Sequence, residues 1–425
     1  MSDKKVIVCF GPGPQFKGGI ANYNTSLAKA FDRLENTEVH IVSWTQQYPA
    51  IIPRDFIDRK SKEDQLAHTN IKVHYITNYN DPRTWRATVK LIESLHPQKV
   101  IFQWAIAVQG IPLGYIARKL KRNKDMEVFF DLHFVIQKEG SNLDRMFTKR
   151  ALKHARSYVA HARKTVDELS VLFPEKQWEV LESGDAYTGK AIKVLKLYHP
   201  VYDMFQPHPD FDVAAAKKEM GLKKHVFLFF GFIRKYKGLH NVIAAFRKVA
   251  DQRDDVSLLI VGESFWNTLD KGKLSTRIKN ATFGVAKKIF LKKQDDERNY
   301  QPLALVDELN LQDLVHVKND FVPNEEVSRY FQVSDNIMLF YLTATPSGIE
   351  SIAYNFKMPM LATRVGHFTE TVRDGYNGYL AEPENIDSMA EVMLKAIDRP
   401  IPRGHVAETS QHMSWENYAQ AILRD

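Results

Sequence analysis

Short apolar runs rich in β-branched residues alternate with segments of helical periodicity along the chain, and this alternation limits the possible fold more than any other feature. Such an order is typical of α/β proteins with parallel sheets. The expected strands of the first half are Val6–Phe10, Val39–Ser43, Val73–Ile76, Val100–Gln103, Val128–Asp131 and Tyr158–His161. Those of the second half are Val226–Phe230, Ser257–Val261, Val315–Lys318, Asn336–Phe340 and Met360–Thr363. Segments such as Leu239–Ala250 have the 3.6-residue period of a helix.

The pattern occurs twice, and the proline-punctuated stretch Leu197–Pro207 between the two halves has the character of a linker. A chain of 425 residues is also too long for one core, because single cores stop growing near ~250–300 residues. We therefore predict two doubly wound, Rossmann-like domains, residues 1–200 and 201–400, followed by a C-terminal segment, residues 401–425. Ligands of such folds bind beyond the carboxyl ends of the strands, so we expect a cleft where the two domains face each other.

A cytoplasmic location is expected from three features. The one cysteine, Cys9, lies in an apolar run, cannot form an internal disulfide and is interpreted as a small buried hydrophobe. No secretory signal follows the charged first residues. The longest uncharged stretch, Ile101–Ala117, is interrupted by Gln103, Gln109, Gly110 and Pro112 and is unsuited to span a membrane.

The formal net charge of +8 is concentrated in two basic stripes of the first half, residues 115–124 and 145–164, neither of which contains an acid. Basic stripes suit anionic partners, and we expect peripheral contact with an anionic membrane at its inner face. The alternative is that they are solvated helix faces. No nucleic-acid partner is expected, because no recognised binding module accompanies the charge.

Three motifs follow expected strands, where a ligand would bind. The first is the loop Gly11–Ile20, whose small residues allow backbone amides to approach an anion at the start of a helix near Ala21. It matches neither the dinucleotide fingerprint nor a P-loop, so alone it is a weak signal.

The second motif, Gly231–Gly238, follows the strand Val226–Phe230. Arg234 offers a planar fork that can hold two phosphate oxygens, and Lys237 adds a mobile charge. Because Lys237 is three positions after Arg234, both cations can reach one diphosphate at the end of the strand.

The third motif is a small-residue turn that opens a helix, with Thr345, Ser347, Gly348, Ile349 and Glu350 as candidate donor-binding residues. Backbone amides near Ser347–Ile349 are expected to face the phosphate that Arg234 and Lys237 hold.

Together these motifs resemble the retaining glycosyltransferases of family 4, also called glycosyltransferase group 1, which have the GT-B fold. The resemblance covers most of the chain and is carried by Gly18–Tyr23, Tyr48-Pro49, Gly231–Gly238, Leu258–Glu263, Phe321–Pro323, Ser347–Gly366, Glu370 and Asp374–Leu380. It implies that the C-terminal segment packs back on the first domain. It also implies that residues 1–200 form the acceptor-side domain and residues 201–400 the domain that binds the nucleotide sugar.

The resemblance assigns roles to individual residues. It implies that Arg234 and Lys237 hold the donor diphosphate, and that Gly18 and Gly19 lie beside the donor phosphates and sugar. His133 resembles the histidine that contacts the donor sugar, and we count it with Arg234 and Lys237 as a catalytic candidate. Glu139 and His161 are weaker candidates nearby.

One departure concerns two glutamates that the family commonly carries seven residues apart. Counted back from Pro359, their positions fall on Ala344 and Ile352, and Glu350 is the nearest carboxylate. This variant, with Thr345 and Ser347-Gly348 at the first position, resembles a bacterial polysaccharide-type subgroup and puts the identity of the donor sugar in doubt.

The expected function is transfer of a hexose-type sugar, with retention, from a UDP- or GDP-linked donor to a glycan or lipid-linked acceptor in cell-surface polysaccharide synthesis. No cofactor is expected, and because no Asp-x-Asp triplet stands in a suitable loop we predict no metal. Two alternatives stay open: a sugar-nucleotide epimerase of the same fold, and a non-catalytic subunit that binds sugar nucleotides.

Overall fold

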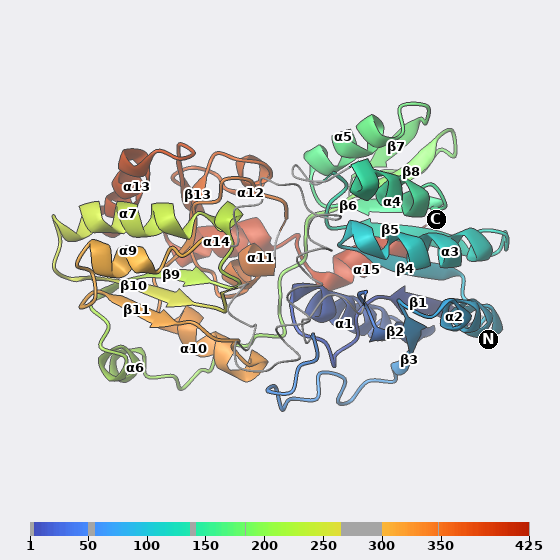
Figure 1. Cartoon of the computed structure of the whole chain (residues 1–425), viewed down its shortest axis with the longest axis horizontal. Helices are drawn as coiled ribbons and strands as arrows, with labels where there is room; N and C mark the ends of the chain where they lie inside the picture. Colours follow the sequence, from blue (N-terminus) through green and yellow to red (C-terminus); the bar gives the residue numbers. More distant parts are fainter. Residues whose placement is uncertain are drawn as a thin grey trace, which may run out of the picture.

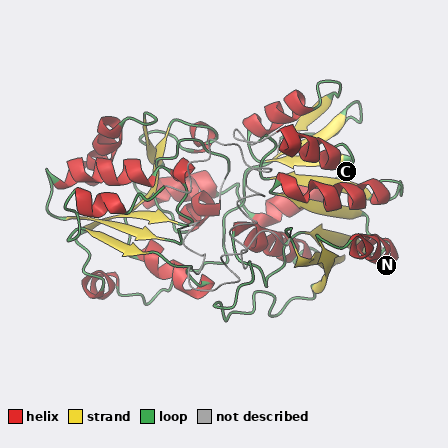
Figure 2. Cartoon of the chain, in the orientation of Figure 1, coloured by secondary structure: helices red, strands yellow, loops and turns green. Residues whose placement is uncertain are grey.

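The structure is a computed structural model that describes residues 4–49, 56–136, 142–182, 184–264, 300–346 and 348–424. It has two lobes, each built around one sheet, which Figure 1 shows side by side. Helices lie on both faces of the sheets (Figure 2). Every strand pair that forms these sheets is parallel, as in β1 with β4 and β9 with β12. The predicted fold class, two Rossmann-like doubly wound domains, is confirmed.

The N-terminal lobe contains an eight-stranded sheet in the order β3-β2-β1-β4-β5-β6-β8-β7. Its strands are β1 Lys5–Phe10, β2 Thr37–Gln46, β3 Lys72–Asn78, β4 Lys99–Trp104, β5 Glu127–Leu132, β6 Ser157–Ala160, β7 Trp178–Leu181 and β8 Ile192–Lys196. Its helices are α1 Gly19–Asp32, α2 Pro82–Ser94, α3 Gly110–Leu120, α4 Asn142–Leu152 and α5 Arg163–Leu172.

The C-terminal lobe contains a six-stranded sheet in the order β11-β10-β9-β12-β13-β14. Its strands are β9 His225–Phe230, β10 Val256–Val261, β11 Val315–Lys318, β12 Asn336–Leu339, β13 Met360–Thr363 and β14 Gly378–Ala381. Its helices are α6 Val213–Glu219, α7 Leu239–Ala250, α9 Ala304–Glu308, α10 Val327–Gln332, α11 Gly348–Asn355, α12 Phe368–Thr371, α13 Ile386–Asp398 and α14 Arg403–Ser410, and they are followed in the chain by α15 Trp415–Leu423.

Burial explains why the strand runs are apolar without alternation. All six residues of β4 and of β10 are buried, because helices cover both faces of a parallel sheet. Each strand predicted from the sequence overlaps an observed one. The strands β7, β8 and β14 were not predicted. In β8 the reason is charge: Lys193 is buried beside Glu127, with 2.9 Å between Nζ and Oε1, so the run does not appear apolar in sequence.

The last helix, α15, returns to the N-terminal lobe, where it packs against α1 (Figure 1). Its start is fixed by Ser414, whose side chain accepts a hydrogen bond from the Asn417 backbone amide, a common N-cap. Trp415 and Tyr418 are buried against Tyr23 of α1, with ring centroids 4.9 Å and 6.2 Å from it. The chain therefore crosses between the lobes twice, once before α6 and once before α15.

A second contact between the lobes lies away from these crossings. Lys60 Nζ is 2.7 Å from Asp320 Oδ2, and the Asn324 amide donates to Ser61 Oγ at 3.2 Å. Lys17 lies over the Phe321 ring, 5.1 Å from its centroid. Loops of the two lobes thus contact each other directly.

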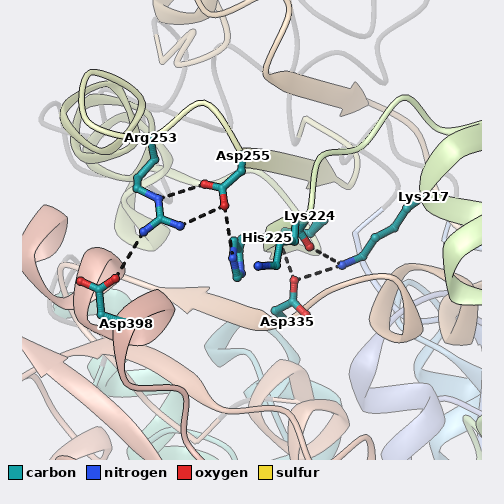
Figure 3. Close-up of polar contacts among 8 residues, drawn as sticks. Lys217, Lys224, His225, Arg253, Asp255, Asp335 and Asp398 are labelled. Carbon is teal, nitrogen blue, oxygen red and sulfur yellow. Dashed lines mark hydrogen bonds and ion pairs between the residues drawn. The ribbon is translucent and has the colours of Figure 1, made fainter.

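Charged residues also cluster where β9 and β10 begin, as Figure 3 shows. Arg253 holds Asp255 through two hydrogen bonds of 2.9 Å and reaches Asp398 at 3.3 Å. Asp335 accepts from the Val226 amide at 2.8 Å and from Lys217 Nζ at 3.2 Å. Because ligands of these folds bind at the opposite, carboxyl ends of the strands, we interpret this cluster as structural.

Within the part of the chain that the structure describes, no helix is both long and apolar enough to cross a bilayer.

Candidate donor site between the lobes

The turn after β9 places Arg234 and Lys237. The Gly231 amide donates to Val261 O at 2.9 Å, and a 3-10 turn, Lys235–Lys237, follows. Gly238 ends this turn with φ 68°, in the left-handed region that favours glycine. A methyl group there would lie 2.1 Å from Phe340 O, so only glycine fits. The backbone therefore fixes the position of Lys237 before any ligand binds.

Lys237 is a buried cation at this turn. Its residue is 6% exposed, and burial together with the charge of Arg234 lowers its pKa to about 7. Its Nζ lies 5.9 Å from the Tyr341 ring centroid, and among the described residues no carboxylate contributes to its electrostatic environment. A buried charge of this kind favours an anionic ligand, because the ligand would supply the missing counter-charge.

The start of α11 lies next to Lys237. A methyl group placed on Gly231 would be 3.0 Å from Lys237 Nζ and 3.0 Å from Ile349 Cδ1. Ile349 is the second residue of α11, so the partial positive charge of this helix start adds to that of the two cations. The structure thus places Lys237 within reach of the charge of Arg234 and near Ile349 at the start of α11.

Tyr202 contacts both the glycine turn of the N-terminal lobe and the start of α11. This linker residue donates from its hydroxyl to Gly19 O at 2.8 Å, and its ring packs on Gly348, where an added methyl group would lie 2.6 Å from Cε2. Gly18 precedes α1 with φ 99°. Gly19 and Gly348 therefore contact the same tyrosine across the two lobes. The sequence analysis did not single out Tyr202.

His133 follows β5 and lies at the N-terminal side of the cleft. Its amide donates to Trp104 O at 3.0 Å, and its Nε2 lies 2.8 Å from Gln103 Oε1. Its ring meets the Tyr23 ring edge-on at 4.7 Å. Burial lowers the pKa of His133 to about 4, so the imidazole is neutral at pH 7 and suits hydrogen bonding to an uncharged group.

Asp131, two residues before His133, is the centre of a hydrogen-bonded network that was not predicted from the sequence. Asp131 is fully buried, and its Oδ1 is 2.9 Å from His161 Nε2 and accepts from the Tyr418 hydroxyl at 3.1 Å. The Tyr23 hydroxyl lies 3.2 Å from the same His161 nitrogen. Burial is the largest single effect and opposes ionisation of Asp131, but the interactions with His161, His133 and the Tyr23 hydroxyl together outweigh it, so the pKa of Asp131 is lowered. The network joins β5 and β6 to α1 and α15.

Glu350 is turned away from open solvent. It is 5% exposed, and its Oε2 contacts His367 Nε2 closely. Thr345 is exposed in the loop before α11. Ala344 and Ile352, the positions where the resemblance leads one to expect glutamates, are 1% and 4% exposed. Glu139 and Ser347 lie outside the described residues.

Comparison with known proteins relates part of the chain to a protein family. Residues 210–414 match the family model of the glycosyl transferases group 1. An uncharacterized glycosyltransferase of Methanocaldococcus jannaschii is 38% identical over 70 residues, which are 16% of this chain and 20% of that protein. The alignment thus spans a fifth of the curated relative.

Solved structures resemble the chain over nearly its whole length. A glycosyltransferase of Rickettsia africae has a TM-score of 0.65 at 13% identity, covering 99% of this chain and 97% of that one. A sucrose-phosphate synthase of Thermosynechococcus elongatus has a TM-score of 0.64 at 15% identity, with coverage of 99% and 97%. The protein HepE of Anabaena, in complex with UDP and glucose, has a TM-score of 0.64 at 14% identity, with coverage of 98% of both chains. At such identities the likeness shows the fold alone. Residues 210–414 therefore match the glycosyl transferases group 1, and the chain as a whole has a GT-B fold of two facing lobes.

Proposed function

We propose that the protein is a retaining glycosyltransferase that moves a hexose-type sugar from a UDP- or GDP-linked donor to a glycan or lipid-linked acceptor. The observation that carries the proposal is the buried ammonium of Lys237, which lies beside Arg234 and the start of α11 without a carboxylate partner among the described residues. A diphosphate is the ligand class that matches two converging cations and a helix start. Complexes of the similar Anabaena protein HepE contain UDP, which agrees with this class of ligand.

In this proposal the residues of the chain act on the departing diphosphate. When the bond between the sugar and the diphosphate breaks, negative charge develops on the leaving group. Arg234 and Lys237 stabilise that charge, and the start of α11 adds its partial charge. The neutral imidazole of His133 contacts the sugar. The two lobes exclude water from the cleft, which favours transfer over hydrolysis.

The role in polysaccharide synthesis and the independence from metal ions are parts of the same proposal and follow from the family resemblance. An epimerase would use a similar donor site but needs no acceptor. A non-catalytic subunit would bind the donor and modify nothing.

A thermal-shift screen across UDP-, GDP- and ADP-sugars identifies the donor, since a ligand that binds only the folded state raises the unfolding temperature. If none of them raised it, the proposal would fail.

Nucleoside-diphosphate binding is expected to weaken as the pH rises from 7 to 8.5. Lys237 has a pKa of about 7 in the free protein, and a bound diphosphate favours its charged form. Above that pH, binding must therefore take up a proton, and the affinity falls on the order of tenfold over this range. Calorimetric titration with UDP and GDP measures it, because the terminal phosphate, with a pKa near ~6, is already ionised.

The Lys237→Arg variant is the control for this pH dependence, because arginine stays protonated throughout. Its affinity is expected to be nearly constant with pH. A wild-type affinity that did not change between pH 7 and 8.5 would show that Lys237 does not take up a proton on binding.

We also propose that the N-terminal lobe contacts anionic membranes. Arg118, Lys121, Lys153 and Lys176 gather around His154, where burial and these four charges lower the pKa of His154 to about 4. Exposed apolar side chains lie on the adjoining helices, namely Leu143 and Met146 on α4 and Val171 on α5. A lobe that presents both clustered cations and exposed apolar groups has the two features of surfaces that bind anionic lipid.

Binding to liposomes that contain anionic lipid is expected at low salt and is expected to fall at 0.5 M salt, because salt screens exposed charges. The double variant Lys121→Glu/Lys153→Glu should lose most of it. The double variant Lys218→Glu/Lys223→Glu, which reverses two exposed charges of the other lobe, should bind as wild type. No binding at low salt would reject the membrane contact.

A further inference from the structure

Glu370 of the C-terminal lobe contacts the start of α5 in the N-terminal lobe. Its Oε2 accepts a hydrogen bond from the Arg163 amide at 3.3 Å and lies 3.9 Å from Nζ of Lys196, the last residue of β8. Glu370 itself is the third residue of α12. One carboxylate therefore joins two elements of the N-terminal lobe to one element of the other lobe.

The start of α5 lacks a cap from its own sequence. Ala162, at the N-cap position, has no side chain that can accept a hydrogen bond, and no acid stands in the first turn. The helix begins with Arg163 and Lys164, so two cations lie at the end that already carries a partial positive charge. The free amides of a helix start need an acceptor, and a carboxylate there is favourable. Glu370 supplies it from the other lobe.

Lys196 places a further cation beside the same carboxylate. It is 7% exposed, and its Nζ lies 4.1 Å from the centroid of the Tyr198 ring. A buried ammonium is costly without a counter-charge, and Glu370 provides that charge. If the lobes moved apart, Lys196 and the start of α5 would both exchange the carboxylate for water.

The element that carries Glu370 is bonded to the helix of the proposed donor site. Tyr354 of α11 donates from its hydroxyl to Thr371 O, at the end of α12, at 2.9 Å. Ile349, at the other end of α11, lies near Lys237. The hydrogen bond restrains α12 against α11, so Glu370 and the donor site are expected to move together.

We infer that Glu370 is an interlobe latch: its carboxylate caps α5 and pairs with Lys196 while the lobes face each other, and this contact favours the closed arrangement. Glu370 is thus a positioning residue that acts through the N-terminal lobe. The effect of the latch on sugar transfer rests on the proposed function. Its effect on the arrangement of the lobes does not.

The arrangement of the lobes can be followed by pulsed electron paramagnetic resonance between two spin labels, one in each lobe. The one cysteine, Cys9, is buried, so labels can be attached at Ser170→Cys on α5 and Glu391→Cys on α13, which are both exposed positions. Without ligand, the protein with Glu370 is expected to show one main distance. Glu370→Gln keeps the shape of the side chain and removes its charge, and it should move most molecules to longer distances.

Glu382→Gln is the matched control. Glu382 is also a carboxylate of the C-terminal lobe in an ion pair, but its partner is Arg364 of the same lobe, at 3.1 Å. This variant should leave the distances between the labels unchanged.

In a transfer assay Glu370→Gln is expected to lower kcat/KM by about tenfold or more and to raise the share of donor lost to hydrolysis about threefold, because separated lobes admit water. The affinity for UDP and GDP should stay within about twofold, since Arg234 and Lys237 belong to the C-terminal lobe. Lys196→Met removes the other charge of the contact and should act in the same direction. The double variant should lose no more than the more affected single variant, because both changes break one contact.

Equal label distances in the protein with Glu370 and in Glu370→Gln would overturn the inference, and so would losses that multiply in the double variant. The thermal unfolding midpoint shows whether each variant is folded, and Lys196→Met provides a second test of the same contact. Failure of the proposed function is distinct. UDP and GDP would then not bind, whereas the distances measured without ligand would still decide whether the latch exists.

Discussion

Replacing Arg234 and Lys237 together with alanine is expected to weaken UDP and GDP binding by at least a hundredfold and to abolish sugar transfer, and each single replacement should weaken binding by tenfold or more. A hydrogen bond from a charged group contributes about 1.5–3 kcal/mol, and tenfold in affinity corresponds to about 1.4 kcal/mol. The two cations are next to one another on one turn, and the charge of Arg234 contributes to the lowered pKa of Lys237. Their losses should therefore combine on one ligand.

Isothermal titration with UDP and with GDP measures the loss. Lys235→Ala is the matched control, since it removes the same charge from the same turn, and it should cost less than threefold. If both alanine variants bound the two nucleotides as tightly as wild type, the turn after β9 would not be the diphosphate site.

The variant Asp131→Ala is expected to lower the free energy of unfolding of the N-terminal lobe by about 3–5 kcal/mol, since it leaves a buried network without its charged member. Asp131 is fully buried and is bound by His161 and by Tyr418 of α15. Its loss should also loosen the return of α15 onto α1, so the C-terminal residues should become more sensitive to protease.

Urea unfolding, followed by a probe in each lobe, measures this because the two lobes need not unfold together. Asp335→Ala is the control. Asp335 is bonded to Val226 and Lys217 in the cluster of Figure 3, but its side chain is 41% exposed, so its loss should cost only about 1 kcal/mol. If both variants lost the same free energy of unfolding, the buried Asp131 network would contribute no more to stability than the half-exposed Asp335.

The elements that the sequence predicted well are those whose signal is local. The predicted strand Val226–Phe230 and helix Leu239–Ala250 differ from the observed β9 and α7 by one residue at most. Both signals, an unbroken apolar run and a helical period, can be recognised from consecutive residues alone. Strand β8 was missed because its buried Lys193 is paired with Glu127 of β5, which the run itself does not reveal.

The distinction between local signals and contacts with distant residues also applies to the candidate site. Arg234 and Lys237 could be found because their turn follows a strand within one motif. Tyr202 could not, since its two contacts, Gly19 and Gly348, lie 183 residues before it and on a helix well after it. Asp131 and His161 appeared in the sequence as ends of two expected strands, and only the neighbouring positions of β5 and β6 in the sheet join them to Tyr418.

The side chains that surround Glu350 could not be predicted from the sequence. The sequence analysis named it as the nearest replacement for the glutamates expected at Ala344 and Ile352. In the structure it is the third residue of α11 and contacts His367, whereas Ile349 beside it faces Gly231 and Lys237.

The central claim, that the protein transfers a sugar from a nucleotide donor, is tested most directly by following the anomeric protons of the donor by NMR in the presence and absence of acceptor. The donor is the sugar nucleotide that stabilises the protein, and the acceptors are alkyl glycosides and lipid-linked sugars. The account predicts that an α-linked donor is consumed only with acceptor and yields an α-linked product and free nucleoside diphosphate. An epimerised sugar nucleotide formed without acceptor, or a donor that binds and stays unchanged with every acceptor, would contradict it.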